Sequence, residues 1–511
     1  VCIRDRCYAL PIQEAGRLPK RYDGQNDPMT QPSNTAIPSL RSEVLRLSLF
    51  GGRLAVSELI LFSLFLTDIL MLGMIGELSL TAALLVNSCF VLCYVTALGL
   101  LQGGLPIASR YFEEDDLPAF HGVTGATLVL ALICAAVVLI TFLAFPPVLH
   151  ALSYPHDLIT ECWRYIAFIL PALVLAMIYI AVRNAIIATG NSRGFIELSI
   201  AGLALNALFN YVLGFGVNFG SLSVPAMGIA GIGLASTIVE TLIFLGFCVL
   251  LWKRGFRLYY SAAGAFVGRL QTVSKMWAAI RPYMRQTTRI GLAVALIFFV
   301  DSTLFSGVLI MVGRHDVQGM AALALIFEWV ALAVMIPVGL SEAIVQRVAQ
   351  VQSQFELGDD AADLPAALRV ILRASYLVTS LYLLIVSIVF IGFDINIPTL
   401  FIVDNEAHPA LIERLDRYAL LGLLVAVFMS FIIVFAAILR GMLDVRTSMI
   451  AVVVCYWGIG LGATFVLVEL LGGGADEALN TVTIALGVGT ATLVARLWVL
   501  IGWSQQAPVS G

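Results

Sequence analysis

Residues 64–73 read L-F-L-T-D-I-L-M-L-G, and residues 298–307 read F-F-V-D-S-T-L-F-S-G. Each stretch carries one aspartate, Asp68 or Asp301, inside a long apolar run. A carboxylate within a membrane helix is costly, so it usually serves a function, although it can simply bond a neighbouring helix. Because the two aspartates occupy corresponding places in the two halves of the chain, the sequence predicts a two-lobed, ion-coupled transporter.

The composition is typical of a membrane protein with little soluble mass. Of 511 residues, 60% are hydrophobic and 12% are charged, and the mean hydropathy is +0.97, whereas soluble domains carry about 25% charged residues. The net charge of −4 says nothing about nucleic acid, but the lack of a basic, aromatic-interleaved stretch predicts no nucleic-acid partner. The eight cysteines form neither a disulfide framework nor a zinc-site pattern. No enzyme signature or phosphate-binding loop is found, so an ion gradient must supply the energy.

Twelve apolar segments reach the length of about 20 residues that a membrane-spanning helix needs. We therefore expect an all-α polytopic membrane protein with twelve transmembrane helices in two six-helix lobes, which form a parallel internal repeat. The predicted spans are 47–75, 79–108, 121–148, 161–187, 195–216, 227–252, 287–313, 319–348, 366–395, 411–440, 446–471 and 479–503.

The longest polar connector divides the spans six and six. Between residues 253 and 286 it holds seven Lys or Arg and no acid. Basic loops stay cytoplasmic, so both termini should be cytoplasmic, with the chain in the inner membrane. The predicted segments are a polar, disordered N-terminus at 1–45 that contains the natural start at Met29, an N-lobe of helices 1–6 at 46–253, a cytoplasmic basic connector at 254–286 with an interfacial helix, a C-lobe of helices 7–12 at 287–504 and a tail at 505–511.

The two halves resemble each other beyond the aspartates. G-L-L-Q-G-G-L-P-I-A-S-R at 99–110 follows the first, and P-V-G-L-S-E-A-I-V-Q-R at 337–347 follows the second. Gly190 and Gly441 begin a second matching pair of segments, before the fifth and eleventh spans. Because both copies have six spans and run in the same direction, an axis along the membrane normal should relate them, with substrate between them.

The motifs resemble the multidrug and toxic compound extrusion (MATE) family, within the multidrug/oligosaccharidyl-lipid/polysaccharide exporter superfamily. The resemblance extends from about residue 45 to residue 503, and it rests on the order and spacing of motifs that are individually weak. They include T-D-I-L-M-L-G at 67–73, L-N-A-L-F-N-Y-V-L-G-F-G at 205–216, G-I-A-G-I-G-L-A-S-T-I at 228–238, F-F-V-D-S-T-L-F at 298–305 and P-V-G-L-S-E-A at 337–343.

The resemblance implies a cation-coupling site in the N-lobe. Asp68 matches the aspartate implicated in proton or sodium coupling, and Asn206 and Asn210 match the two polar positions of the fifth span that join it. Ser236 falls where the family usually has a threonine, with Thr237 beside it. Asn206 and Asn210 are four residues apart and so share a helix face, although two such amides can also serve simply as packing bonds between helices.

The C-lobe departs from the family pattern. Asp301 falls where sodium-coupled members carry a glutamate, but the acid that those members have in the tenth span is missing near Met429 and Ser430. The resemblance therefore implies a role for Asp301 in cation coupling without a complete C-lobe cation site. Asp68, Asn206 and Asn210 have the oxygens to hold Na⁺, but a desolvated aspartate also takes up a proton, and we favour H⁺ over Na⁺.

Other intramembrane side chains are candidates for a substrate cavity, with structural pairing or lipid contact as the alternatives. They are Glu240, Glu328, Phe299 and Phe305. Arg183 and Glu342 lie near predicted cytoplasmic helix ends, where snorkelling towards the interface would explain their charges.

The sequence therefore predicts a monomeric antiporter in the lipid bilayer that exports amphipathic, cationic small molecules in exchange for H⁺ or Na⁺ by alternating access, with no cofactor besides the coupling ion. One alternative is a lipid-linked sugar flippase of the same superfamily, which would tend to have a basic cavity. The other is a membrane receptor or scaffold that transports nothing, a class with no reason to repeat buried carboxylates in both lobes.

Overall fold

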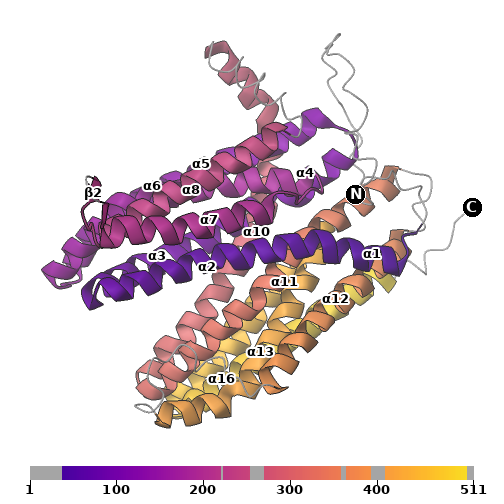
Figure 1. Cartoon of the computed structure of the whole chain (residues 1–511). Helices are drawn as coiled ribbons and strands as arrows, with labels where there is room; N and C mark the ends of the chain where they lie inside the picture. The colour runs from indigo at the N-terminus through magenta and orange to yellow at the C-terminus, as the bar shows by residue number, and fades with distance from the viewer. Residues whose placement is uncertain (1–36, 220–221, 254–269, 358–363, 393–408, 503–511) are drawn as a thin grey trace, which may run out of the picture. The chain divides into compact units, whose positions relative to one another are not determined.

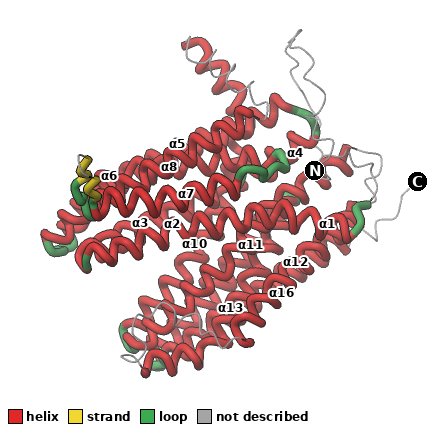
Figure 2. The backbone as a smooth tube through the Cα atoms, in the orientation of Figure 1, coloured by secondary structure: helices red, strands yellow, loops and turns green. Residues whose placement is uncertain are grey.

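The computed structural model describes residues 37–219, 222–253, 270–357, 364–392 and 409–502. Almost all of these residues are helical (Figure 2), and twelve helical segments are long and apolar enough to cross a membrane. This confirms the predicted all-α fold with twelve spans, which we number 1–12 in chain order.

Spans 1–6 make up the N-lobe and spans 7–12 the C-lobe. The N-lobe elements are α1 (Leu40–Arg46), the π-helix η1 (Leu47–Gly51), α2 (Gly52–Ile75), α3 (Glu77–Gln102), α4 (Gly104–Glu113), α5 (Leu117–Ala151), α6 (His156–Ala188), α7 (Phe195–Phe209), the π-helix η2 (Asn210–Phe215) and α8 (Ile229–Lys253). The C-lobe elements are α10 (Leu270–Gly313), α11 (Val317–Leu357), α12 (Leu364–Gly392), α13 (Pro409–Gly441), α14 (Val445–Val453), η5 (Val454–Leu461), α15 (Gly462–Thr464), η6 (Phe465–Leu470) and α16 (Ala475–Gly502).

Two close helix crossings join the lobes, and each pairs one helix from either lobe. In the first, α3 packs on α10, and a Cβ on Gly99 would lie 2.6 Å from the Cα of Ala295. In the second, α11 packs on α2, and a Cβ on Gly339 would lie 2.5 Å from the backbone nitrogen of Ala55. The first crossing joins span 2 to span 7, and the second joins span 8 to span 1. The six-span repeat relates span 1 to span 7 and span 2 to span 8, so it converts each crossing into the other. Small residues permit this approach where a larger side chain would force the helices apart.

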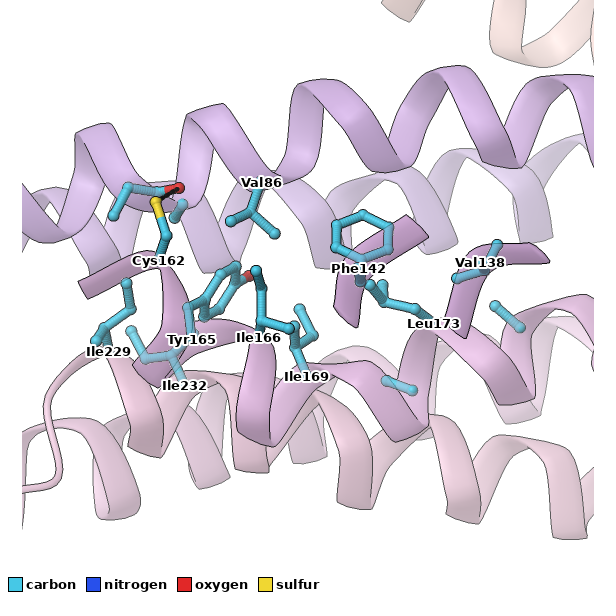
Figure 3. Packing of buried hydrophobic residues seen from close by; sticks show 14 of the residues in the cluster. Val86, Val138, Phe142, Cys162, Tyr165, Ile166, Ile169, Leu173, Ile229 and Ile232 are labelled. Atoms are coloured by element: carbon cyan, nitrogen blue, oxygen red, sulfur yellow. Dashed lines mark hydrogen bonds between the residues drawn. The ribbon is translucent and has the colours of Figure 1, made fainter. Parts of the chain in front are cut away.

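Within the N-lobe, α6 supplies much of the buried apolar surface. Figure 3 shows Tyr165, Ile166 and Ile169 of α6 among side chains from neighbouring helices, including Val86 of α3 and Phe142 of α5. Figure 1 shows α2, α3 and α7 running side by side, in agreement with their contacts. This packing holds α2, α7 and α8 in place and so determines where their polar side chains lie.

Two features differ from a run of plain α-helices. Spans 5 and 11, which correspond in the repeat, both contain π-helical turns, at η2 and at η5 and η6. π-turns occur often at functional sites. A two-stranded antiparallel ribbon, β1 (Val217–Phe219) with β2 (Leu222–Val224), joins spans 5 and 6, and the sequence did not predict it.

Two of the predicted segment boundaries fall inside helices. Helix α1 already begins at Leu40, because the Ser39 side chain accepts a hydrogen bond from the Ser42 backbone N–H and caps it, so the polar N-terminal segment ends before residue 45. Helix α10 runs unbroken from Leu270 into span 7, so the second part of the predicted connector continues that span. Met29, the rest of the connector and the tail after residue 502 lie outside the described residues. The division into segments stays a prediction.

Candidate functional site

The Asp68 carboxylate, in the second half of α2, is the centre of a buried polar cluster in the N-lobe. Asn206 of α7 donates to its Oδ1 at 3.0 Å, and Asn210, the first residue of η2, donates to the same oxygen at 2.6 Å. Ser236 of α8 lies 2.9 Å from Oδ2. Asp68 is 9% exposed, and its three partners are each 8% exposed or less. The structure thus brings together four of the predicted residues, from three spans.

The Ser236 hydroxyl lies between two acceptors. Its Oγ is 2.9 Å from Asp68 Oδ2 and 3.0 Å from the carbonyl oxygen of Ile232. A hydroxyl has one hydrogen to donate and can also accept. With a charged Asp68 the hydrogen points to the carboxylate. When Asp68 is protonated, the hydroxyl can accept a hydrogen bond from the carboxylic acid and donate its own hydrogen to the Ile232 carbonyl oxygen, so this geometry accommodates a proton without moving a heavy atom.

The two amides turn their nitrogen atoms towards Asp68. Besides its bond to the carboxylate, the Asn210 Nδ2 donates to Asn206 Oδ1 at 3.2 Å, and the Asn210 Oδ1 is buried without a partner among the described residues. Both amides thus act as hydrogen-bond donors to the carboxylate in this structure. Within the described residues, no group of three or more His, Cys, Asp or Glu is placed to hold a metal ion.

Thr237 does not join the cluster. It is adjacent to Ser236 on α8, but its Oγ1 donates to the carbonyl oxygen of Phe168 on α6 at 2.5 Å. Consecutive residues of a helix point in different directions, which explains why only one of the two hydroxyls reaches Asp68.

Asp301, on α10, has a different environment. It is partly buried, and within the described part of the chain we find no hydrogen bond to its carboxylate. Tyr456 of η5 is within its electrostatic reach. Ser430, at the position where the family acid is missing, donates to the carbonyl oxygen of Ala426 on its own helix at 2.6 Å. The predicted cation-coupling residues therefore divide into a cluster around Asp68 and a separate Asp301.

The four predicted cavity residues also separate. Glu240 of α8 is partly buried one helical turn after Ser236, within electrostatic reach of Asp68, and we find no hydrogen bond to it from described residues. Glu328 of α11 is exposed. Phe299 meets Trp457 edge-on with centroids 6.2 Å apart. Two further rings, Phe305 and Phe327, meet edge-on at 4.8 Å.

Arg183 and Glu342 do not snorkel, contrary to the sequence interpretation. They are 3% and 2% exposed and form a two-pronged ion pair between α6 and α11, in which Nη1 lies 2.7 Å from Oε1 and Nη2 2.7 Å from Oε2. Arg183 Nη2 also donates to Glu58 of α2. The bond to Glu342 crosses from the N-lobe to the C-lobe, so burial at the lobe interface, rather than access to the membrane surface, accounts for both charges.

Arg440, at the end of α13, extends this network. It donates to Gln102 at the end of α3, across the lobe interface, and to Ser341 within the C-lobe at 3.2 Å. Its charge also acts on Glu342. We call Glu58, Arg183, Glu342 and Arg440 the inter-lobe cluster. It lies towards the end of the molecule where spans 4 and 10 finish.

A second ion pair between the lobes lies nearby. Glu43 of α1 accepts two hydrogen bonds from the Arg347 Nε and one from its Nη2, at 3.2, 3.0 and 2.5 Å, and both residues are at most 6% exposed. Further along α11, Ser353 donates to Glu114 at 3.0 Å. No local sequence pattern predicts these pairs, although charged side chains within membrane spans usually pair with one another.

Comparison with known proteins agrees with the fold. The MatE family model matches residues 54–212 and 293–466. A probable multidrug resistance protein NorM from Mesorhizobium japonicum is 26% identical over 77% of this chain and 80% of its own length. The multidrug resistance protein NorM of Burkholderia vietnamiensis is 26% identical over 92% of this chain and 95% of its length.

Solved structures with the same fold share less sequence. The eukaryotic MATE transporter AtDTX14 superposes with a TM-score of 0.74 at 15% identity, over 91% of this chain and 98% of that one. A transporter from Pyrococcus furiosus, whose structure is titled "Reverse polarity of binding pocket suggests different function of a MOP superfamily transporter", gives a TM-score of 0.73 at 15% identity, over 92% and 98%. At this identity the likeness shows the fold alone.

Proposed function

Because this chain belongs to the MATE family of multi-pass membrane transporters, we propose that it is an antiporter that exports amphipathic, cationic compounds in exchange for a cation bound at Asp68. The relatives named as multidrug resistance proteins support the substrate class. The observation that carries the proposal is the buried Asp68 carboxylate with three polar partners from spans 5 and 6.

The proposed mechanism is competition for one negative charge. A buried carboxylate is costly unless a proton, a cation or hydrogen-bond donors compensate for it. A cationic compound bound near Asp68 and the coupling ion would each compensate for the charge of Asp68, so binding of one favours release of the other. Uptake of the external ion then drives release of the compound outside, and the lobes rock inward to reload.

The coupling ion that we favour is H⁺. The Ser236 hydroxyl supports this choice because it can reverse its hydrogen bond when Asp68 is protonated. The amide nitrogens of Asn206 and Asn210, which face the carboxylate, also favour H⁺. Sodium binding would require both amides to turn an oxygen inwards and would break the bonds that they make here.

Glu240 and the aromatic pair of Phe299 and Trp457 are our candidates for substrate contact. Glu240 adds a second acidic group near Asp68 in the N-lobe, and a cation would be attracted to both. The rings of the pair present an apolar surface from the C-lobe. Glu328 and Phe305 are weaker candidates, because Glu328 is exposed and Phe305 already packs on Phe327.

We place the protein in the inner membrane as a monomer with both termini cytoplasmic, because the basic residues between positions 253 and 286 favour that side. The inter-lobe cluster is then at the cytoplasmic end. A lipid-linked sugar flippase is less well supported. Such a protein would need cationic side chains that are free to bind the phosphate of its substrate. Arg183 and Arg440 already bond other residues of the lobe interface.

Efflux from cells tests the function as a whole. Cells that express the protein and are loaded with a fluorescent lipophilic cation should lose the dye faster than cells with an empty vector. Collapse of the membrane ion gradients should abolish the difference, because the chain has no nucleotide-binding loop to supply energy. Equal dye retention in both cell lines, with the protein present in the membrane, would contradict the proposal.

A further inference from the structure

The inter-lobe cluster contains one arginine and one glutamate from each lobe. Arg183 and Glu58 belong to the N-lobe, and Arg440 and Glu342 belong to the C-lobe. The formal charges therefore cancel within each lobe as well as within the whole cluster. Arg183 is the shared member, because its Nη2 contacts both Glu58 of its own lobe and Glu342 of the other.

When the lobes separate, one of the two Arg183 contacts must break and the other can remain. The two-pronged pair with Glu342 must break, since it crosses the interface. The contact with Glu58 lies within the N-lobe and can persist. On the other side, Glu342 loses Arg183, but Arg440 is close enough for their charges to act on one another, and it already bonds Ser341, the residue before Glu342.

We infer that the inter-lobe cluster is a partner-exchange device, in which Arg183 passes from Glu342 to Glu58 alone, and Glu342 passes to Arg440, when this end of the transporter opens. Leaving one member of a buried ion pair unpaired is strongly unfavourable. Partner exchange avoids that cost in both lobes. The pair with Glu342 holds the closed state together, whereas the pair with Glu58 matters most in the open state.

This inference rests on the alternating access of the proposed function, but it makes a separate prediction about the sign of two substitutions. Glu342→Gln weakens the closed state, so the population should move towards open. Glu58→Gln leaves the two-pronged pair intact in the closed state and removes the partner that Arg183 needs in the open state, so the population should move towards closed. If Glu58 served only to stabilise the closed arrangement of Arg183, its substitution would weaken the closed state. The population would then move towards open, as it does for Glu342→Gln.

Distances between spin labels at the ends of spans 5 and 11 measure these populations. Glu197 of α7 and Arg446 of α14 are exposed, and each begins its span at the end where the cluster lies. Both would be replaced by labelled cysteine in the full chain, after substitution of the native cysteines and a check that thermal stability is retained. The distribution is recorded without substrate or ion gradient. Removing a hydrogen bond to a charged group should change the ratio of open to closed by about tenfold.

The matched control is Glu161→Gln. Glu161 lies near the start of α6, at the other end of the N-lobe, and accepts a hydrogen bond from Ser79 at 2.7 Å. It should leave the distance distribution unchanged. If Glu58→Gln does not fold, Glu58→Asp serves in its place, because it keeps the charge but withdraws it from Arg183 by one methylene, and the shift towards closed should be smaller.

Opposite shifts for Glu58→Gln and Glu342→Gln support partner exchange. Shifts in the same direction, or no shift for Glu58→Gln, overturn it. The result is independent of the drug: opposite shifts in a protein that exports no cationic dye would leave partner exchange standing and refute the proposed function. Active export of the dye together with shifts in the same direction would support the proposed function and overturn partner exchange.

Discussion

Asp68 and Asp301 occupy corresponding spans of a repeated fold, yet their surroundings differ. Asp68 accepts hydrogen bonds from two amides and lies against a hydroxyl, whereas we find no hydrogen bond to Asp301 from the described residues. The lobes also meet through two crossings that the repeat exchanges. Repetition of a backbone, and even of an acid on it, therefore does not repeat the site that surrounds the acid.

The cause is visible in the partner spans. Asn206 lies 16 residues after Gly190, and 16 residues after Gly441 the chain has Trp457. The amide of the N-lobe is thus an indole in the C-lobe, where its Nε1 donates to Thr303 at 2.9 Å. An indole has one hydrogen to donate, and here it goes to Thr303 rather than to the Asp301 carboxylate. The N-lobe is therefore equipped to stabilise a carboxylate, and the C-lobe presents an aromatic surface.

The largest effect should follow from Asp68→Asn. The amide keeps the shape of the side chain but cannot carry the negative charge for which ion and substrate compete, so coupled export should fall to the background of cells with an empty vector. Initial efflux rates from cells with matched amounts of protein measure this. The control is Asp157→Asn, an exposed aspartate at the start of α6, which should export normally. Efflux by the Asp68 variant at the rate of the control would remove the carboxylate from the mechanism.

An intermediate effect is expected for Asn210→Ala. This substitution removes the 2.6 Å bond to Asp68 and the 3.2 Å bond to Asn206. A hydrogen bond to a charged group contributes about 1.5 kcal/mol or more, so export should slow by about tenfold. Asn206→Ala removes the longer 3.0 Å bond to Asp68, so it should slow export less than Asn210→Ala does. The reverse order of the two rates would show that the contacts seen at Asp68 do not govern coupling.

How far the sequence predicts this molecule depends on the range of the interaction. The twelve spans follow from apolar length, and the cluster around Asp68 was predicted because its members fall on motifs of a recognised family. The inter-lobe cluster was not predicted, because Arg183 and Glu342 are 159 residues apart and the sequence around either residue does not indicate which residue it pairs with. Snorkelling, a local explanation, was preferred and was wrong.

Thr237 shows a second limit. Sequence position alone did not separate it from Ser236, because either hydroxyl satisfies the family pattern. The orientation of α8 against α6 decides, by directing Thr237 to the carbonyl oxygen of Phe168. That orientation depends on the packing of whole helices, which single-residue patterns do not contain.

A small effect is expected for Asp301→Asn. With no hydrogen-bonded shell to disrupt, the substitution should change the export rate by no more than about twofold, which corresponds to less than 1 kcal/mol. The measurement is efflux over a range of substrate concentrations, so that a change in affinity is separated from a change in maximal rate. Loss of export comparable to that of Asp68→Asn would mean that both lobes take part in coupling.

The smallest effect concerns stability at acid pH. Burial alone would raise the pKa of Asp316, in the turn between α10 and α11, but the Gly319 N–H and the Arg414 guanidinium outweigh it and hold that pKa below its usual value. The carboxylate therefore stabilises the fold above about pH 4, and this contribution is lost as the pH falls through the lowered pKa. We expect Asp316→Asn to be less stable than the parent at pH 7, by less than about 1 kcal/mol, and the difference to shrink as the pH falls through the lowered pKa of Asp316. An unchanged difference at acid pH would show that the charge is not responsible.

The central claim is that the Asp68 cluster couples export to protons, and purified protein in liposomes tests it most directly. Substrate transport is measured with an imposed pH gradient in sodium-free medium, and separately with a sodium gradient at constant pH. We predict transport driven by the pH gradient alone, with no transport by Asp68→Asn. The absence of transport under the pH gradient, together with its restoration by the sodium gradient, would contradict the account.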